Sequence, residues 1–174
     1  MRFGELIALT WDEVDFEKGF LKTYRRFNTL SHKFVPPKNK TSIRIVPIDE
    51  ECIKILQVLH TQQEKANKEL GIRNHSKMIF QHFGYIHSVP DIASVNKALN
   101  VILNKLDIYP IITTKGARHT YGSYLWHKGF DLGVIAKILG HKDISMLVEV
   151  YGHTLEEKIY EEFNNIKYIW KETP

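Results

Sequence analysis

A series of apolar stripes at helical spacing, which runs from residue 49 to the C-terminus, restricts the fold most strongly. Asp49 is a good N-cap for a helix that extends to about Leu70, where Gly71 stops it. A second helix opens within Ser88–Asp91 and ends at Tyr109-Pro110. Segments with this period fold as helices that bury one face, so most of the chain after residue 49 is predicted to be helical.

Shorter helices are predicted in the C-terminal part. The chain is again helical from Gly116, and Asp131 caps a helix that ends at Gly140. A short helix follows Asp143, and the capping box Thr154-Leu155-Glu156-Glu157 predicts the start of the last helix. The apolar stripe of that last helix consists of Leu155, Ile159, Phe163, Ile166 and Trp170.

The first 48 residues have a different pattern. Residues 2–9 predict a short amphipathic helix, and residues 12–19 predict a turn region. β-Branched and aromatic residues in loose alternation predict strands at 20–27 and 43–48, with a hairpin region and a basic tip over residues 28–42. The predicted fold class is therefore mainly α, with a small antiparallel β-sheet near the N-terminus.

Composition excludes several classes of protein. The length of 174 residues favours one domain, and 43% hydrophobic with 25% charged residues is ordinary for a soluble globular protein. Cys52 is the single cysteine, which excludes an internal disulfide and a CxxC zinc site. No apolar run reaches the roughly 18 residues of a membrane span. The histidines at 75, 82 and 87 lack the spacing of ligands on one helix, so no metal site is expected.

The densest polar cluster of the sequence lies at residues 113–120. Lys115 and Arg118 are three residues apart and share a helix face, and arginine offers a planar fork of donors to phosphate oxygens. A net charge of +4 favours a polyanionic partner without requiring one. Taken singly, however, Lys115 and Arg118 fit a solvated basic face, His141 fits a structural histidine and Tyr151 fits a packing residue.

Taken together, four segments resemble the catalytic domain of the tyrosine recombinases, the phage integrase family. They are Arg2 in RFGELIALTWDEVDF, Arg118 in KGARHTYGSYL, LGH at 139–141 and Tyr151 in VYGHT. The order is that of the family, and the resemblance covers essentially all of residues 1–174. It implies a mainly α domain with a three-stranded antiparallel sheet. It also implies cutting and rejoining of DNA through a 3′-phosphotyrosyl intermediate, without a metal or nucleotide cofactor.

The resemblance also implies roles for individual residues. Arg2 and Arg118 take the two arginine positions, His141 takes the position held by His or Trp, and Tyr151 is the nucleophile. Lys38 fits the catalytic lysine at the tip of the hairpin, as the general acid that protonates the leaving oxygen.

Three further positions are less settled. Lys115 stands where the family usually has the first histidine of HxLRH, so it is either a base or a donor to a phosphate oxygen. Lys40, two residues from Lys38, is an alternative general acid. Glu5 either orients Arg2 through a buried pair or is an ordinary helix-face carboxylate. Contacts with DNA are expected from Lys40, Thr113 and Lys142.

The resemblance favours a site-specific recombinase, an integrase of a phage or mobile element. A type IB topoisomerase is one alternative, and a recombinase-derived DNA-binding regulator, kept open by Lys115, is another. We expect a C-terminal catalytic fragment without the core-binding and arm-binding domains. Its expected partner is double-stranded DNA in the bacterial cytoplasm, at the nucleoid, with an accessory excisionase as a candidate partner.

We expect a homotetramer on synapsed DNA and a monomer or weak dimer without DNA. The last helix then has two interpretations: it folds back onto its own core, or it docks on a neighbouring protomer.

Overall fold

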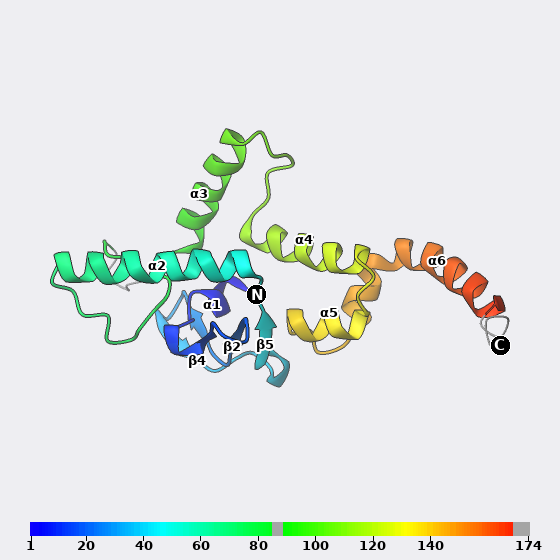
Figure 1. The fold of residues 1–174 in the computed structure, drawn as a ribbon, viewed down its shortest axis with the longest axis horizontal. Helices are drawn as coiled ribbons and strands as arrows, with labels where there is room; N and C mark the ends of the chain where they lie inside the picture. The colour runs from blue at the N-terminus through cyan, green and yellow to red at the C-terminus, as the bar shows by residue number, and fades with distance from the viewer. Residues whose placement is uncertain (85–88, 169–174) are drawn as a thin grey trace.

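The computed structural model describes residues 1–84 and 89–168, except for the side chains of 150–158, 161, 162 and 165. Helices predominate (Figure 1). They are α1 (Phe3–Leu6), α2 (Glu50–Glu69), α3 (Ile92–Lys105), α4 (Thr114–His127), α5 (Leu132–Leu139) and α6 (Ser145–Tyr168), with the short 3-10 helices η1 (Trp11–Glu13) and η2 (Lys40–Ser42). The strands are β1 (Val14–Asp15), β2 (Phe20–Thr23), β3 (Arg26–Asn28), β4 (Lys33–Val35) and β5 (Arg44–Pro47). The predicted fold class is confirmed.

The main sheet has three antiparallel strands in the order β1-β2-β5. Leu21 of β2 lies opposite Val46 of β5, and both side chains are buried in a core that also contains Leu56 of α2. Because side chains alternate along a strand, Arg44 points to the same side as Val46 and is also buried. The sheet therefore presents an arginine to the interior of the molecule.

The prediction of one strand over residues 20–27 is wrong. The strand ends at Thr23, and β3 pairs instead with β4 in a separate two-stranded sheet. Arg25 lies at the break, where it donates to the carbonyl oxygen of Ala8 at 3.1 Å and pairs with Glu13 at 3.5 Å. These contacts turn the chain, so that Phe27 packs in a different core from the residues of β2.

The predicted basic hairpin tip is also placed differently. The turn between β3 and β4 is formed by residues 29–32, where the Asn28 side chain accepts hydrogen bonds from the backbone of Leu30 and Ser31. Lys38 and Lys40 come after β4, on the exposed segment that returns to β5. Pro36-Pro37 starts this return segment and cannot supply the N–H groups that pairing with β3 would need.

Two helix predictions also need correction. The helix expected over residues 2–9 is shorter, because Thr10 caps η1 and pairs with Met78 as an isolated bridge. The separate short helix after Asp143 and the new start at Thr154 are wrong, because α6 is one helix from Ser145. Asp143 accepts from the backbone N–H of Ser145, and no proline interrupts the helix that follows.

A second core joins α4, α5 and the start of α6. Its buried members are Leu125, Ile135, Ala136, Leu139 and Leu147. Ile138 packs against both this helical core and the core beneath the sheet, so α5 is fixed to both. Beyond this core α6 leads away from the rest of the molecule (Figure 1). Across residues 1–84 and 89–168, no helix is both long and apolar enough to cross a membrane.

The substitution Ile135→Ala tests this position of α5. Ile135 is 0% exposed, whereas the neighbouring Val134 is 46% exposed. We expect Ile135→Ala to lower the free energy of unfolding by about 2–5 kcal/mol, because it removes packed methyl groups and leaves a cavity. The control Val134→Ala should change it by about 0.5 kcal/mol or less. Urea denaturation followed by circular dichroism measures both, and equal losses would contradict the described burial of α5.

Candidate active site around the end of helix α5

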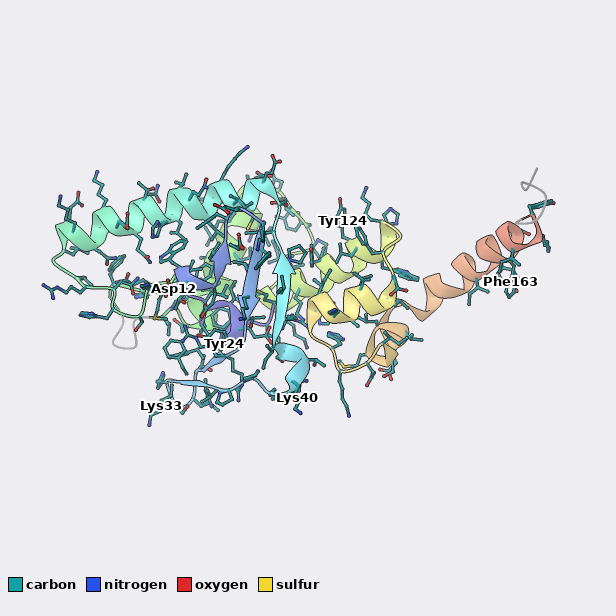
Figure 2. The ribbon with its side chains drawn as sticks, turned by 60° about the horizontal axis from the view of Figure 1, so that its bottom comes forward. Asp12, Tyr24, Lys33, Lys40, Tyr124 and Phe163 are labelled. Carbon is teal, nitrogen blue, oxygen red and sulfur yellow. The ribbon has the colours of Figure 1, made fainter. Side chains whose placement is uncertain are left out.

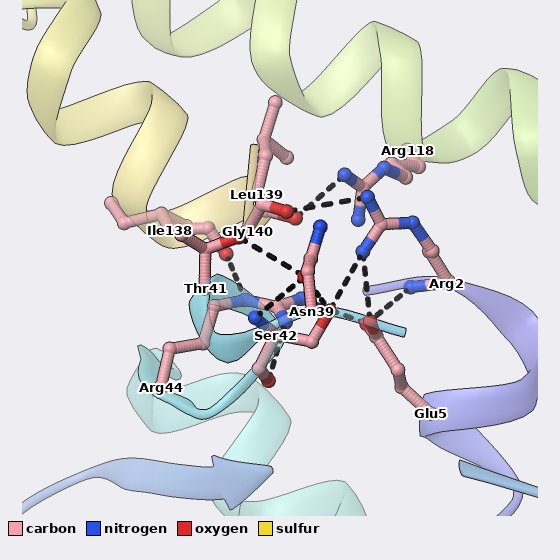
Figure 3. Close-up of polar contacts among 10 residues, drawn as sticks. All are labelled: Arg2, Glu5, Asn39, Thr41, Ser42, Arg44, Arg118, Ile138, Leu139 and Gly140. Carbon is pink, nitrogen blue, oxygen red and sulfur yellow. Dashed lines mark hydrogen bonds and ion pairs between the residues drawn. The ribbon is translucent and has the colours of Figure 1, made fainter. Parts of the chain in front are cut away.

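Three arginines from three different elements meet at the C-terminus of α5 (Figure 3). The helix ends at Leu139, and the capping residue Gly140, with a φ of 72°, turns the chain so that three successive carbonyl groups face outward. Each carbonyl accepts from a different arginine: Ile138 O from Arg44 Nε at 2.7 Å, Leu139 O from Arg118 Nη2 at 2.6 Å, and Gly140 O from Arg2 Nη2 at 3.2 Å. The partial negative charge of a helix C-terminus favours guanidinium groups at this place.

Glu5 links two of these arginines. Its carboxylate accepts from the backbone N of Arg2 at 2.9 Å, from Arg2 Nη1 at 3.0 Å and from Arg44 Nη2 at 2.9 Å. Burial disfavours the charged carboxylate, but hydrogen bonds from Arg44 and Arg2 outweigh this effect and hold the pKa of Glu5 below its ordinary value. Of the two interpretations of Glu5, the structure contains the buried pair that orients Arg2.

Arg118 reaches the site from α4 and keeps a donor free. Its Nη1 is buried and has no hydrogen-bond partner among the described residues. Burial, followed by repulsion from Arg2, lowers the pKa of Arg118 to about 10, so the guanidinium is still charged at neutral pH. An unpaired buried donor costs about 1–3 kcal/mol, and a phosphate oxygen is an acceptor that matches the arginine fork.

His141 follows the turn at Gly140, and one of its ring nitrogens is also unpaired among the described residues. Its Nδ1 is buried without a hydrogen-bond partner in the part of the chain that the structure describes. Burial and then the charges of Arg118 and Arg2 hold the pKa of His141 below its ordinary value. The imidazole is therefore neutral at neutral pH, and it offers a hydrogen-bonding group without adding to the positive charge of the three arginines.

These side chains border a cavity of about 370 Å³. Four of the residues expected at the catalytic site line it: Arg2, Lys115, Arg118 and His141. Lys38 lines a neighbouring cavity of about 440 Å³, which also contains Arg2 and Ser42. Four of the six expected residues thus line one cavity, and Lys38 lines a second cavity that shares Arg2 with it. For Tyr151, the sixth, the backbone lies in α6 and the side chain lies outside the described residues.

The residues expected to contact DNA are spread around this site. Thr113 is exposed and caps α4, where its hydroxyl accepts from Gly116 N at 3.3 Å. Lys40 lies in η2 (Figure 2). It lines neither of the two cavities that contain Arg2. Lys142 lines a third cavity, between β5 and α5, together with His141.

Sequence reasoning missed Arg44 and His119. His119 lines the cavity of Arg118, one residue further along α4. Arg44 was detectable in principle, because strand alternation places it on the core-facing side with Val46. A charged residue at a core-facing position needs buried partners. An arginine on the core-facing side of a predicted strand therefore indicates a buried polar network. For metals, no cluster of three or more His, Cys, Asp or Glu side chains suits an ion within the described ranges.

The sequence of this chain is similar to a known protein family and to several of its members. Residues 1–158 match the model of the phage integrase family. The ICEBs1 integrase of Bacillus subtilis (strain 168) is 33% identical over 161 residues, which cover 91% of this chain and 43% of the relative. The transposase from transposon Tn916 of Enterococcus faecalis is 26% identical over 159 residues, which cover 88% of this chain and 39% of the relative.

Solved structures show the same fold. The Tn1549 transposon integrase in complex with transposon right end DNA matches with a TM-score of 0.74 at 20% identity, over 96% of this chain and 55% of that chain. The XerA recombinase matches with a TM-score of 0.62 at 21% identity, over 99% of this chain and 54% of that one.

The small antiparallel sheet, the helical core and the arginine cluster together define a tyrosine recombinase catalytic fold. The match over residues 1–158 shows that the chain belongs to the phage integrase family. It spans less than half the length of the curated relatives described above, 43% and 39%.

The substitution Gly140→Ala tests how closely the turn is fitted to the arginines. A Cβ at this position would lie 2.7 Å from Arg44 Nη1, and the positive φ is unfavourable for alanine. We expect a loss of roughly 1–3 kcal/mol in the free energy of unfolding. Gly129→Ala is the matched control, because Gly129 also has a positive φ but open space around its Cβ position. If thermal denaturation shows equal losses for the two variants, the contact with Arg44 is not the cause.

Proposed function

We propose that this chain is the catalytic domain of a site-specific DNA recombinase of mobile elements. It cleaves and rejoins DNA through a 3′-phosphotyrosyl intermediate formed by Tyr151. The observation that carries the proposal is the convergence of Arg2 and Arg118 on one turn, beside buried polar atoms of Arg118 and His141 that have no partner among the described residues. A phosphodiester group supplies the acceptors and the negative charge that such a cluster binds.

The chemistry assigns a task to each group. The Tyr151 hydroxyl gives up its proton to water as its oxygen attacks phosphorus, the new P–O bond forms, and the bond to the 5′-oxygen breaks. Arg2 and Arg118 stabilise the charge that gathers on the non-bridging oxygens, which is the largest catalytic contribution in reactions of this kind. Because the phosphotyrosyl bond retains the energy of the phosphodiester, the reverse attack by a 5′-hydroxyl reseals the strand without a nucleotide cofactor.

Proton transfer completes the step. Lys38 lines the cavity next to Arg2, whereas Lys40 does not, so we assign Lys38 as the general acid for the 5′-oxygen. Lys115 lies one helical turn before Arg118 on α4 and lines the same cavity. We assign its ammonium to the non-bridging oxygens, and His141 to hydrogen bonding at the same phosphate.

Double-stranded DNA is the proposed partner. The Tn1549 integrase, which shares the fold, was solved in complex with transposon right end DNA. Lys40 and Lys142 are exposed, and Thr113 lies exposed at the N-terminus of α4, where backbone N–H groups favour an anion. We propose that these three residues contact the DNA backbone, in the bacterial cytoplasm at the nucleoid. An excisionase is the proposed accessory partner.

The names of the relatives favour recombination over the two alternatives. They include an integrase of Bacillus subtilis and a transposase of Enterococcus faecalis. We propose that residues 1–174 form the C-terminal catalytic domain of a longer recombinase. A topoisomerase would relax DNA without exchange between two sites, and a regulator would form no covalent complex.

The substitution Tyr151→Phe tests the assigned nucleophile. On a DNA substrate whose cleavage is trapped, the unaltered chain should form a covalent protein–DNA complex that survives denaturing electrophoresis. Tyr151→Phe should abolish this complex, because the phenolic oxygen is lost, and should change DNA affinity by less than about twofold. Tyr160→Phe, on the same helix, is the control and should leave the complex intact. A covalent complex formed by Tyr151→Phe would rule out the assignment.

We further propose that protomers assemble through α6. The apolar residues Ile159, Phe163 and Ile166 are exposed on this helix, and Figure 2 shows Phe163 beyond the helical core. A groove of about 930 Å³ between β5 and α5 is bordered by exposed isoleucines, among them Ile43 and Ile45. A second copy of α6 matches the chemistry of this groove. The assembly on synapsed DNA is then a homotetramer, and the DNA-free protein is a monomer or weak dimer.

The substitution Phe163→Ala tests docking in trans. It should leave trapped cleavage at a single site unchanged and weaken pairing of two DNA sites about tenfold or more, because a buried aromatic anchor is lost. Pairing is measured by native gel electrophoresis with two labelled duplexes. Tyr160→Ala, on the same helix but away from the stripe, should have little effect. A large drop in the melting temperature of Phe163→Ala would show that the helix packs on its own core instead.

A further inference from the structure

Arg44 is the most deeply buried charged side chain of the arginine cluster. Its side chain is 2% exposed, compared with 39% for that of Arg2. It lines neither of the two cavities that contain Arg2. A phosphate bound in those cavities is therefore approached by Arg2 and Arg118, and any effect of Arg44 on the reaction passes through other residues.

The three nitrogen atoms of the Arg44 guanidinium donate to three different elements. Nε donates to Ile138 O of α5 at 2.7 Å, Nη1 donates to Ser42 O of η2 at 3.1 Å, and Nη2 donates to Glu5 at 2.9 Å. The first of these elements leads directly into His141, the second follows Lys38, and the third begins after Arg2. One planar group is thus hydrogen-bonded to the three segments that position the proposed catalytic residues Arg2, Lys38 and His141 (Figure 3).

The turn after α5 is shaped around this group. A Cβ on Gly140 would approach Nη1, Cζ and Nε of Arg44 within 2.7, 2.9 and 3.1 Å. Only the absence of a side chain allows the backbone to lie so close to the guanidinium plane. The same turn carries the carbonyl oxygens that hold Arg2 and Arg118.

Arg44 also determines the charge that Arg2 presents. Glu5 contacts both arginines, and without Arg44 its full negative charge would lie beside Arg2 alone. Paired with Arg44, the carboxylate orients Arg2 while most of the charge of Arg2 is left for an anion. Arg118 and the Met1 amino group are the other charged groups near Glu5.

We propose that Arg44 is a positioning residue of the recombinase reaction, which acts through Glu5 on Arg2 and through the turn after α5 on His141. The proposal rests on the proposed function, because it concerns the binding of the same scissile phosphate. Lysine does not replace arginine here, since one ammonium cannot present the fixed planar fork that reaches all three acceptors.

Arg44→Lys in this chain tests the proposal, with Arg25→Lys as the matched control. Arg25 also donates to a backbone carbonyl and pairs with a glutamate, but it contacts no residue of the cluster. The probe is inorganic phosphate, titrated by NMR on the arginine side-chain signals. Arg44→Lys should weaken phosphate binding about tenfold, and Arg25→Lys should change it by less than about twofold.

Trapped DNA cleavage gives the second readout. Arg44→Lys should slow single-turnover cleavage about 10²-fold, as small misplacements of catalytic groups do. In the background of Arg2→Lys, the same substitution should slow cleavage by less than about threefold, because its main route through Arg2 is already lost. A purely structural role predicts that the two effects multiply.

The outcomes separate the two claims. If the unaltered chain binds phosphate but does not cleave DNA, the proposed function fails and the phosphate titration still decides the role of Arg44. The inference is overturned if the unaltered chain binds no phosphate, if Arg44→Lys behaves like Arg25→Lys, or if its effect multiplies with that of Arg2→Lys. If Arg44→Lys does not fold by circular dichroism, Glu5→Asp takes its place, because the shorter carboxylate cannot bridge both arginines. Unchanged phosphate binding by Glu5→Asp would also overturn the inference.

Discussion

The site depends on the hydrogen bonds that three arginines donate to backbone carbonyl groups at the C-terminus of α5. Three successive carbonyl groups face outward there, and each accepts from an arginine that arrives from a different part of the chain. Arg2 precedes α1, Arg44 lies in β5 and Arg118 lies in α4. Guanidinium groups would repel one another if they were brought together alone, so the negative end of the helix and the carboxylate of Glu5 are what allow them to converge.

The cluster contains one arginine whose nitrogen atoms are all paired within the protein, and two residues that each keep an unpaired polar atom among the described residues. Arg44 is buried, and its Nε, Nη1 and Nη2 each donate to a partner within the protein. Arg118 and His141 line the same cavity, and each keeps a buried polar atom without a partner among the described residues. A site prepared in this way needs little reorganisation when an anion enters, because the backbone has already fixed the donors.

The sequence predicted the parts that depend on local pattern or on motif. The helical period and caps located α2, α3 and α5, and the motifs around Arg2, Arg118 and residues 139–141 led to the arginine cluster. The break after Thr23 was not predictable, because it depends on contacts of Arg25 with residues far from it in the chain. Local capping signals likewise favoured a helix start at Thr154, where the fold continues one helix. Arg44 was overlooked because its partners are distant in sequence.

The arginines bind backbone oxygens of α5, and this has a consequence for how the protein tolerates change. A substitution at Ile138 or Leu139 alters packing but leaves the carbonyl acceptor in place, since every amino acid carries one. The helix can therefore exchange side chains without losing the groups that hold the site. A deletion of one residue within α5 is a different matter, because it rotates the last turn by about 100° and points all three acceptors away from their arginines.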